Sequence, residues 1–253
     1  MDHPLNEAVL RLRAPAAFAV HQLAKHMPVF QALFPQVSVE LCTRNRRLAG
    51  AQAQDLTIQM RQPPRGAQLQ ARRLARTEAV LCASPDYLDR HGRPRHPAEL
   101  SQHKLLRPPV AAPRGAGPAA GALLLWPAGE GAVPRAAPPV LVQPEARACI
   151  STIDLDLVYA SALSGLGICG LPSFVVEDAL LENVLERVLP RWHLHTASLW
   201  LCRPAGPVLP AATQAMLDFL HGTFGGREDD PWLAAVERAT RSDHGRPSAQ
   251  AAA

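Results

Sequence analysis

Residues 152–172 read Thr-Ile-Asp-Leu-Asp-Leu-Val-Tyr-Ala-Ser-Ala-Leu-Ser-Gly-Leu-Gly-Ile-Cys-Gly-Leu-Pro, and this stretch decides the fold. Asp154 suits the N-cap of a helix, because its carboxylate can accept hydrogen bonds from the free amides of the first turn. Gly165 predicts the end of that helix, since the left-handed position after a helix favours a residue without Cβ. The apolar run at 167–171, which Pro172 ends, is typical of a strand covered on both faces. We therefore expect a helix that leads into a parallel strand of an α/β domain.

The first sixty residues alternate between strand and helix patterns. Alternating apolar residues predict strands at 9–14, 37–42 and 55–60, and apolar residues at helical spacing predict a helix over 16–34. Asn45 suits the cap of a short second helix. The order strand, helix, strand, helix, strand indicates a parallel, doubly wound sheet.

The rest of the chain carries shorter predicted elements. Residues 108–139 are rich in Pro, Ala and Gly, which predicts loops around a short strand at 123–126. Further strands are predicted at 140–142 and 197–202, and a last long helix at 210–224.

The C-terminal residues suggest one more helix. Asp230 suits its cap and Pro231 its first position. One face would be apolar and could dock on the domain or on a neighbour, through Trp232, Ala235 and Val236. A weakly ordered tail is an equal alternative, and residues 241–253 are expected to be disordered.

Composition limits the class of protein. With 253 residues and 47% hydrophobic content, the chain can form one large domain or two lobes. A net charge of +4 does not indicate a nucleic-acid-binding face, because the arginines are scattered and no compact basic helix carries interleaved aromatics. Five cysteines without a Cys-x-x-Cys pair favour reduced thiols in the cytoplasm. The sequence shows neither a signal peptide nor a membrane-spanning apolar stretch of about 18 residues.

Two motifs are the most specific in the chain, Ala-Ser-Pro-Asp-Tyr-Leu at 83–88 and His-Gly-Arg-Pro at 91–94. Other motifs occur in order around them, at 10–15, 27–41, 55–60, 162–172 and 187–192. Together they resemble the effector-binding domain of LysR-type transcriptional regulators.

This resemblance implies an α/β, two-lobed fold similar to the type 2 periplasmic binding proteins. Each lobe is then a mostly parallel sheet flanked by helices, and two crossing strands join the lobes. The expected division is residues 1–82 with 172–224 as lobe I, 83–171 as lobe II, and 225–253 as a C-terminal extension with a short helix followed by disorder.

Full-length members of that family begin with a winged helix-turn-helix, which does not precede the first strand predicted here. We therefore expect the sensor half without the DNA-reading half. A truncated gene, a mis-called start, an excised domain and a free-standing sensor remain open.

The resemblance also implies where an effector binds. In open α/β sheets, ligands bind beyond the carboxyl ends of the strands, where helix N-termini suit a carboxylate or similar anion. Carried over by position, the expected effector contacts are Pro15, Ala16, Ala17, Phe18, Thr43, Arg44, Asn45, Met60, Arg61, Ala83, Ser84, Ile153, Asp154, Leu171, Pro172 and Ser173.

Two of these positions depart from the family pattern. Arg61 replaces a glycine, and its guanidinium could either clamp a carboxylate with two hydrogen bonds or point to solvent. Ala16 and Ala17 stand where many relatives have a serine or threonine. This change disfavours a small hydroxy acid as effector and leaves a larger, partly aromatic or amphipathic ligand, or none, as alternatives.

Catalytic and metal sites are not predicted. Ser164 lacks the preceding glycine of a nucleophile elbow, and Asp154 with Asp156 fits helix capping rather than acid–base chemistry. His193 and His195 would share one strand face, but no spacing suggests the further ligands of a metal. We expect no enzyme activity, no cofactor and no metal.

The sequence therefore predicts the sensor of a LysR-type regulator, in which a small, anionic organic effector shifts the population between two domain arrangements. The expected partners are further copies of this domain, which pair antiparallel through the helices of lobe I. DNA is contacted only through a domain outside this chain, and a membrane is not a partner. Two alternatives are a truncated regulator that only forms mixed oligomers, and a solute-binding protein of the same fold. The lack of a signal peptide and the unpaired cysteines argue against the second.

Overall fold

The computed structural model of the chain describes residues 8–43, 55–64, 68–106, 122–128, 138–143, 150, 152–206, 209–226 and 228–244. The chain forms two compact units: unit 1 comprises residues 1–77 and 197–229, and unit 2 comprises residues 78–196 and 230–253. Two long strands, β4 (Leu69–Ala83) and β10 (His195–Pro204), contribute residues to both units.

This division differs from the lobes expected from the sequence. The chain passes between the units within β4 and near the start of β10, rather than after residues 82 and 171. Residues 172–196 group with unit 2, where β7 (Cys169–Pro172) and residues 186–188 both pair with β4. The helix that follows residue 229 also belongs to unit 2.

Unit 1 contains, besides parts of β4 and β10, the elements β1 (Ala8–Arg13), α1 (Ala16–Phe18), η1 (Ala19–Leu23), α2 (Ala24–Leu33), β2 (Val37–Cys42), β3 (Leu56–Gln59) and α6 (Ala211–Phe224). β1 pairs parallel with β2 on one side and with β3 on the other, and β10 is antiparallel to β3. Leu12 lies opposite Leu41 and Leu56 in this register. The three strands predicted in the first sixty residues are confirmed.

The helix predicted over 16–34 forms as α1, a π-helical turn at η1, and α2. Its apolar face packs on α6, where Phe18 meets Phe224 at 5.4 Å and Phe30 meets Phe219 at 5.2 Å between ring centroids. The helix predicted after Asn45 lies outside the described residues.

Unit 2 contains α3 (Pro85–His91), η2 (Pro97–Gln102), β5 (Leu123–Pro127), β6 (Val140–Val142), α4 (Leu155–Leu163), β7, α5 (Ser173–Leu181), β8 (Glu186–Val188), β9 (Trp192–His193) and α7 (Pro231–His244). β7 and β8 pair with β4, and β5 lies between β6 and β9 in a second sheet. The strands predicted at 123–126 and 140–142 form as β5 and β6.

The stretch 152–172 folds largely as its sequence predicts. Asp154 Oδ1 accepts from the amides of Asp156 and Leu157, at 3.0 and 3.3 Å, and caps α4. Gly165 adopts a left-handed conformation with φ of 72° after the helix ends. The expected parallel pairing occurs only at Ile168, which bridges Leu105; β7 itself runs antiparallel to β4, with Ala79 opposite Pro172.

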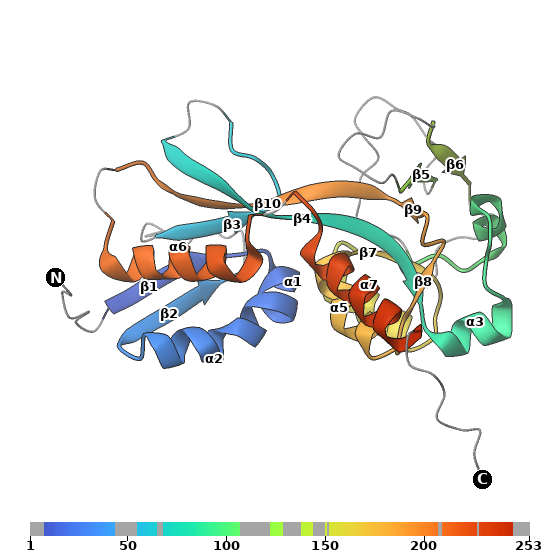
Figure 1. Ribbon diagram of the computed structural model, residues 1–253. Helices are drawn as coiled ribbons and strands as arrows, with labels where there is room; N and C mark the ends of the chain where they lie inside the picture. The colour runs from blue at the N-terminus through green and yellow to red at the C-terminus, as the bar shows by residue number, and fades with distance from the viewer. Residues whose placement is uncertain are drawn as a thin grey trace, which may run out of the picture. The chain divides into compact units, whose positions relative to one another are not determined.

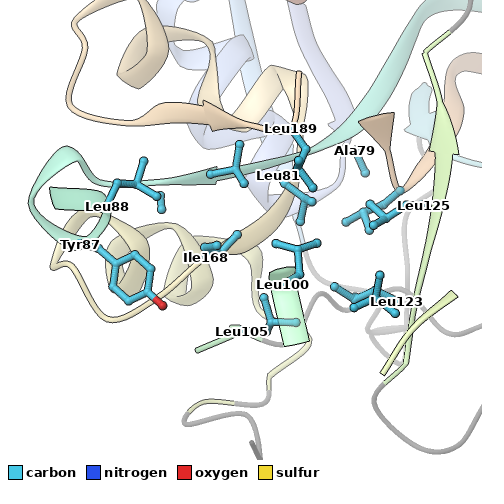
Figure 2. Packing of buried hydrophobic residues seen from close by; sticks show 14 residues of the cluster. Ala79, Leu81, Tyr87, Leu88, Leu100, Leu105, Leu123, Leu125, Ile168 and Leu189 are labelled. Atoms are coloured by element: carbon cyan, nitrogen blue, oxygen red, sulfur yellow. The ribbon is translucent and has the colours of Figure 1, made fainter. Parts of the chain in front are cut away.

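Gly167 lies where two backbones approach closely in the core of unit 2. A Cβ atom here would overlap the carbonyl oxygen of Lys104. That oxygen accepts from the amide of Ile168 at 2.8 Å, and the carbonyl of Ile168 accepts from Leu106 at 2.8 Å. Ile168 belongs to an apolar cluster with Leu81 and residues from α3, η2 and β5 (Figure 2).

The C-terminal helix α7 is part of unit 2 and lies beside α5 (Figure 1). Trp232 is 3% exposed and meets Phe174 at 5.7 Å between ring centroids. The predicted cap is present, since Asp230 Oδ1 accepts from the amides of Trp232 and Leu233. Residues 241–244, expected to be disordered, continue the helix, and residues 245–253 lie outside the described part. In the part that the structure describes, no helix has the length and apolar character needed to span a membrane.

Candidate functional site

In unit 1, the predicted effector contacts gather at one edge of the sheet. Because β1, β2 and β3 run parallel, their carboxyl ends share that edge, with Arg13 opposite both Cys42 and Thr57. Thr43 and Arg61 follow β2 and β3 there, and both are exposed. The edge therefore presents a cationic side chain beside the first turn of α1.

The predicted contacts on α1 are only partly accessible. Phe18 is fully buried against α6 and Ala17 is buried, so both belong to the core of unit 1. Pro15 is half-buried and Ala16 is exposed. Arg44 and Asn45 lie outside the described residues.

In unit 2, two predicted segments lie at the same end of the fold. α4 leads into β7 and packs along it, so the start of α4 lies near the end of β7. This arrangement groups Ile153 and Asp154 with Leu171, Pro172 and Ser173. The first two are exposed and the last three are buried.

Ala83 and Ser84 do not join that group. In the antiparallel register Cys82 lies opposite Cys169, whereas Pro172 lies opposite Ala79. At about 3.3 Å per residue, the four residues from Ala79 to Ala83 place the two ends roughly 13 Å apart. The family resemblance implies a crossing between the lobes at Ala83, and this is why the two residues are expected in that group.

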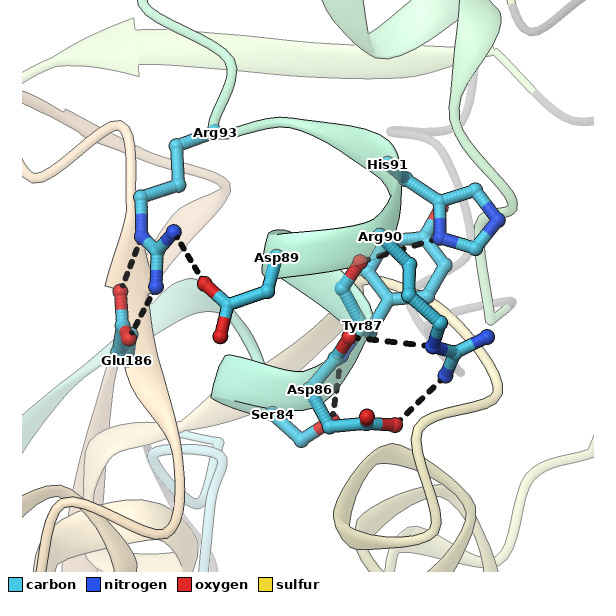
Figure 3. A network of polar contacts seen from close by, with 8 residues as sticks. All are labelled: Ser84, Asp86, Tyr87, Asp89, Arg90, His91, Arg93 and Glu186. Atoms are coloured by element: carbon cyan, nitrogen blue, oxygen red, sulfur yellow. Dashed lines mark hydrogen bonds and ion pairs between the residues drawn. The ribbon is translucent and has the colours of Figure 1, made fainter.

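The most specific sequence motif builds a structural network around α3 (Figure 3). Ser84 Oγ accepts from the amide of Tyr87 and caps this helix. Arg93 donates to both carboxylate oxygens of Glu186 at 2.7 and 2.8 Å, and to Asp89 at 2.7 Å. These hydrogen bonds raise the pKa of Arg93 and hold α3 to β8.

Tyr87 completes this network from the inside. It is fully buried, stacks on His91 with 4.3 Å between centroids, and its hydroxyl accepts from the amide of Lys104 at 3.0 Å. The same hydroxyl contacts His103 Nδ1 at 3.2 Å, and burial lowers the pKa of His103. The motif therefore positions α3 and contributes no accessible chemistry.

Asp230 is a polar centre that the sequence showed only as a helix cap. Its second oxygen, Oδ2, accepts from Ser173 Oγ at 2.6 Å and from the amide of Glu78 at 2.7 Å. Burial raises the pKa of Asp230, while the hydrogen bonds from Ser173, Leu233 and Glu78 oppose the rise. The carboxylate that caps α7 thus also binds the interior of β4, at Glu78, and the first residue of α5.

The raised pKa of Asp230 predicts a pH dependence of stability. Its folded-state pKa lies above the ordinary value of 3.8, so this carboxyl group contributes stability below the unfolded-state pKa and loses it as the pH rises through the folded-state pKa. Relative to Asp230→Asn, the unaltered chain should gain free energy of unfolding as the pH is lowered from neutrality toward 3.8. Urea unfolding across this range measures the difference, and a difference that stays constant or shrinks on acidification would contradict it.

The structure offers little for catalysis or metal binding. His193 lies in β9 and His195 in β10, not on one strand face as predicted. Among the described residues, no three His, Cys, Asp or Glu side chains come together to hold a metal ion. Cys82 and Cys169 are buried with sulfurs 3.3 Å apart, and this contact together with burial raises the pKa of Cys169, which disfavours a reactive thiolate.

Comparison with known proteins gives one consistent family. The model of the LysR substrate binding domain family matches residues 4–225. The probable HTH-type transcriptional regulator LtrA of Klebsiella pneumoniae is 29% identical over 217 residues, which are 83% of this chain and 63% of that protein. The HTH-type transcriptional regulator PtxR of Pseudomonas aeruginosa is 27% identical over 219 residues, which are 85% of this chain and 64% of that protein. The chain thus spans somewhat less than two thirds of these relatives.

Solved structures show the same fold. The structure of CrgA, a LysR-type transcriptional regulator from Neisseria meningitidis, has a TM-score of 0.67 at 20% identity and covers 88% of this chain and 70% of that chain. The regulatory domain of AphB from Vibrio vulnificus has a TM-score of 0.66 at 18% identity, over 85% of this chain and 98% of that chain.

Proposed function

Because this chain belongs to the LysR substrate-binding domain family, we propose that it is the ligand-sensing part of a LysR-type transcriptional regulator. The fold is the two-lobed α/β fold of that family's regulatory domains, similar to type 2 periplasmic binding proteins. In this proposal the domain binds a small organic effector and controls transcription from the cytoplasm, and it has no catalytic role. DNA is contacted through a part of the regulator outside this chain.

The effector in this proposal is an organic anion. The observation that carries this choice is the position of Arg61 at the carboxyl edge of the unit 1 sheet, exposed and without an ion pair to any described residue. A guanidinium can bind a carboxylate with two parallel hydrogen bonds. The start of α1 lies at the same edge, where free amides favour negative charge. Ala16 and Ala17 give the first turn of α1 no hydroxyl, which favours a partly aromatic acid over a hydroxy acid.

Thermal unfolding against small carboxylates, aromatic acids and amino acids tests this proposal. An acid at about 100 times its dissociation constant should stabilise the chain by about 2.7 kcal/mol, a rise in Tm of roughly 5–10 °C. Arg61→Ala should remove most of that rise. Arg191→Ala, an exposed arginine in unit 2, serves as the matched control and should keep it.

A flat response to all acids, from a folded chain, would contradict effector binding of this class. A response that survives Arg61→Ala would leave effector binding in place and remove the role of Arg61.

Association with further copies of the domain also belongs to this proposal. The α1–α2 helix of unit 1 exposes apolar side chains at Val20, Val29 and Leu33, which are 56%, 54% and 61% exposed. Apolar groups gathered on one helix favour contact with another protein. The same surface supports the alternative function, in which the chain only forms mixed oligomers with longer regulators. Co-purification with such a regulator and no response to any acid would favour that alternative.

A further inference from the structure

The matched family domain ends at residue 225, and the residues from 230 onward form part of unit 2. α7 packs on α5 through Trp232, Leu233 and Val236, all buried. Glu237 also forms a long ion pair with Arg187, at 3.7 Å. The extension is therefore a docked helix, and its first residues reach the end of β7.

Asp230 uses its two carboxylate oxygens for different tasks. Oδ1 caps α7 by accepting from Trp232 and Leu233, which is all that an N-cap requires. Oδ2 is not needed for capping, and it accepts from Ser173 Oγ and from the amide of Glu78. A serine at position 230 would cap the helix equally well. The second oxygen therefore binds unit 2 rather than its own helix.

The groups that bind Oδ2 lie in the predicted effector region. Ser173 is an expected effector contact, and it is 1% exposed in this structure. It directly follows β7, which packs along α4, and Ile153 and Asp154 just before α4 are exposed. A hydroxyl and a backbone amide that converge on one carboxylate oxygen suit an effector carboxylate equally well. In this structure, the chain itself supplies that carboxylate.

We propose that the C-terminal segment from Asp230 to His244 is an internal competitor of the effector. Asp230 holds Ser173 Oγ and the Glu78 amide while α7 is docked, and the carboxylate of an organic acid takes these groups when the segment is displaced. Effector binding and docking of α7 then oppose each other, so the helix lowers the apparent affinity of the sensor. This inference rests on the proposed function, because it assigns a regulation to the same effector.

The test uses the full chain with acetate and benzoate as probes. Asp230→Ser keeps a cap for α7 and removes the oxygen that binds Ser173. Asp229→Ser, the exposed neighbour, is the matched control. We expect Asp230→Ser to bind acetate or benzoate at least ten-fold more tightly than the unaltered chain, measured by calorimetry at constant ionic strength with chloride as the reference anion. Adding Ser173→Ala should remove that gain, and Asp229→Ser should show none.

Equal dissociation constants for the unaltered chain and Asp230→Ser would overturn the inference, and so would a gain that persists after Ser173→Ala. If Asp230→Ser does not fold, Asp230→Asn replaces it, because it keeps a capping oxygen and turns an amide nitrogen toward Glu78. Acids that bind both chains equally would support the proposed function and reject the competition. Binding that appears only in the Asp230 variants, and that Arg61→Ala leaves unchanged, would support the competition and reject the anion clamp.

Discussion

Replacing Trp232 with alanine is expected to lower the free energy of unfolding of unit 2 by about 3–5 kcal/mol, the usual cost of removing a large buried aromatic side chain. Trp232 is 3% exposed and packs edge-on against Phe174 of α5. Removal of the indole leaves a cavity between α5 and α7. The surrounding side chains are closely packed and cannot rearrange enough to fill it. Urea unfolding followed by circular dichroism measures the loss.

Arg241→Ala is the matched control for this change, because it lies on the exposed side of the same helix. Its effect should stay within about 0.5 kcal/mol. A loss below about 1 kcal/mol for Trp232→Ala would show that α7 is not stably docked in solution. That result would also remove the basis for competition by this helix.

Gly167→Ala is expected to cost about 2–6 kcal/mol, although it adds only one methyl group. The new Cβ would overlap the carbonyl oxygen of Lys104, which is backbone and cannot rotate away. Relief requires breaking the hydrogen bonds that join Ile168 to Lys104 and Leu106. Overpacking costs about 1–3 kcal/mol and each buried, unsatisfied backbone group adds about 1–3 kcal/mol.

The contrasting substitution is Gly222→Ala in the last turn of α6. No atom lies within 4 Å of its added Cβ, and the residue is exposed. Alanine should therefore stabilise this helix by about 0.5–1 kcal/mol, opposite in sign to the effect at Gly167. Equal effects of the two changes would show that close packing at Gly167 is not what requires glycine.

Sequence patterns predicted those structural features that depend only on neighbouring residues. The cap at Asp154 depends on the amides of the next turn, and the left-handed Gly165 depends on one φ angle. Strands β1, β2 and β3 follow from alternation within six residues or fewer. The direction of β7 could not be predicted in this way, since it depends on pairing with β4 almost ninety residues earlier.

The long strand β4 escaped sequence analysis for a related reason. Its first four residues, 69–72, are exposed, whereas its last five are buried. Neither half alternates cleanly, so the pattern did not reveal one continuous strand. The crossing between the lobes was therefore expected at Ala83 rather than within β4. Ala83 and Ser84 were accordingly grouped with Pro172, although in the register of β4 and β7 they lie at the other end of β7.

Effector binding at the predicted contacts stays a prediction, and the burial of several of them could not be read from the sequence. Phe18 lies in α1, Leu171 in β7 and Ser173 at the start of α5, and all three are buried. Their burial comes from partners distant in sequence, such as Phe224 and Asp230. From the sequence, Asp230 could be recognised only as a helix cap. Its second role is to accept hydrogen bonds from Ser173 and Glu78, which are distant in the chain, so it leaves no local pattern.

The discontinuous make-up of the two units constrains how the chain can fold as it leaves the ribosome. The sheet of unit 1 stays open at β3 until β10 has been made, and residues 78–196 emerge between them. At translation rates of about 5–20 residues per second, this edge waits on the order of ten seconds. Unit 2 in turn lacks α7 until unit 1 has received α6. During this interval, nascent chains expose the unpaired edge of β3 and the side of α5 that α7 later covers. They therefore depend most on chaperones at this stage.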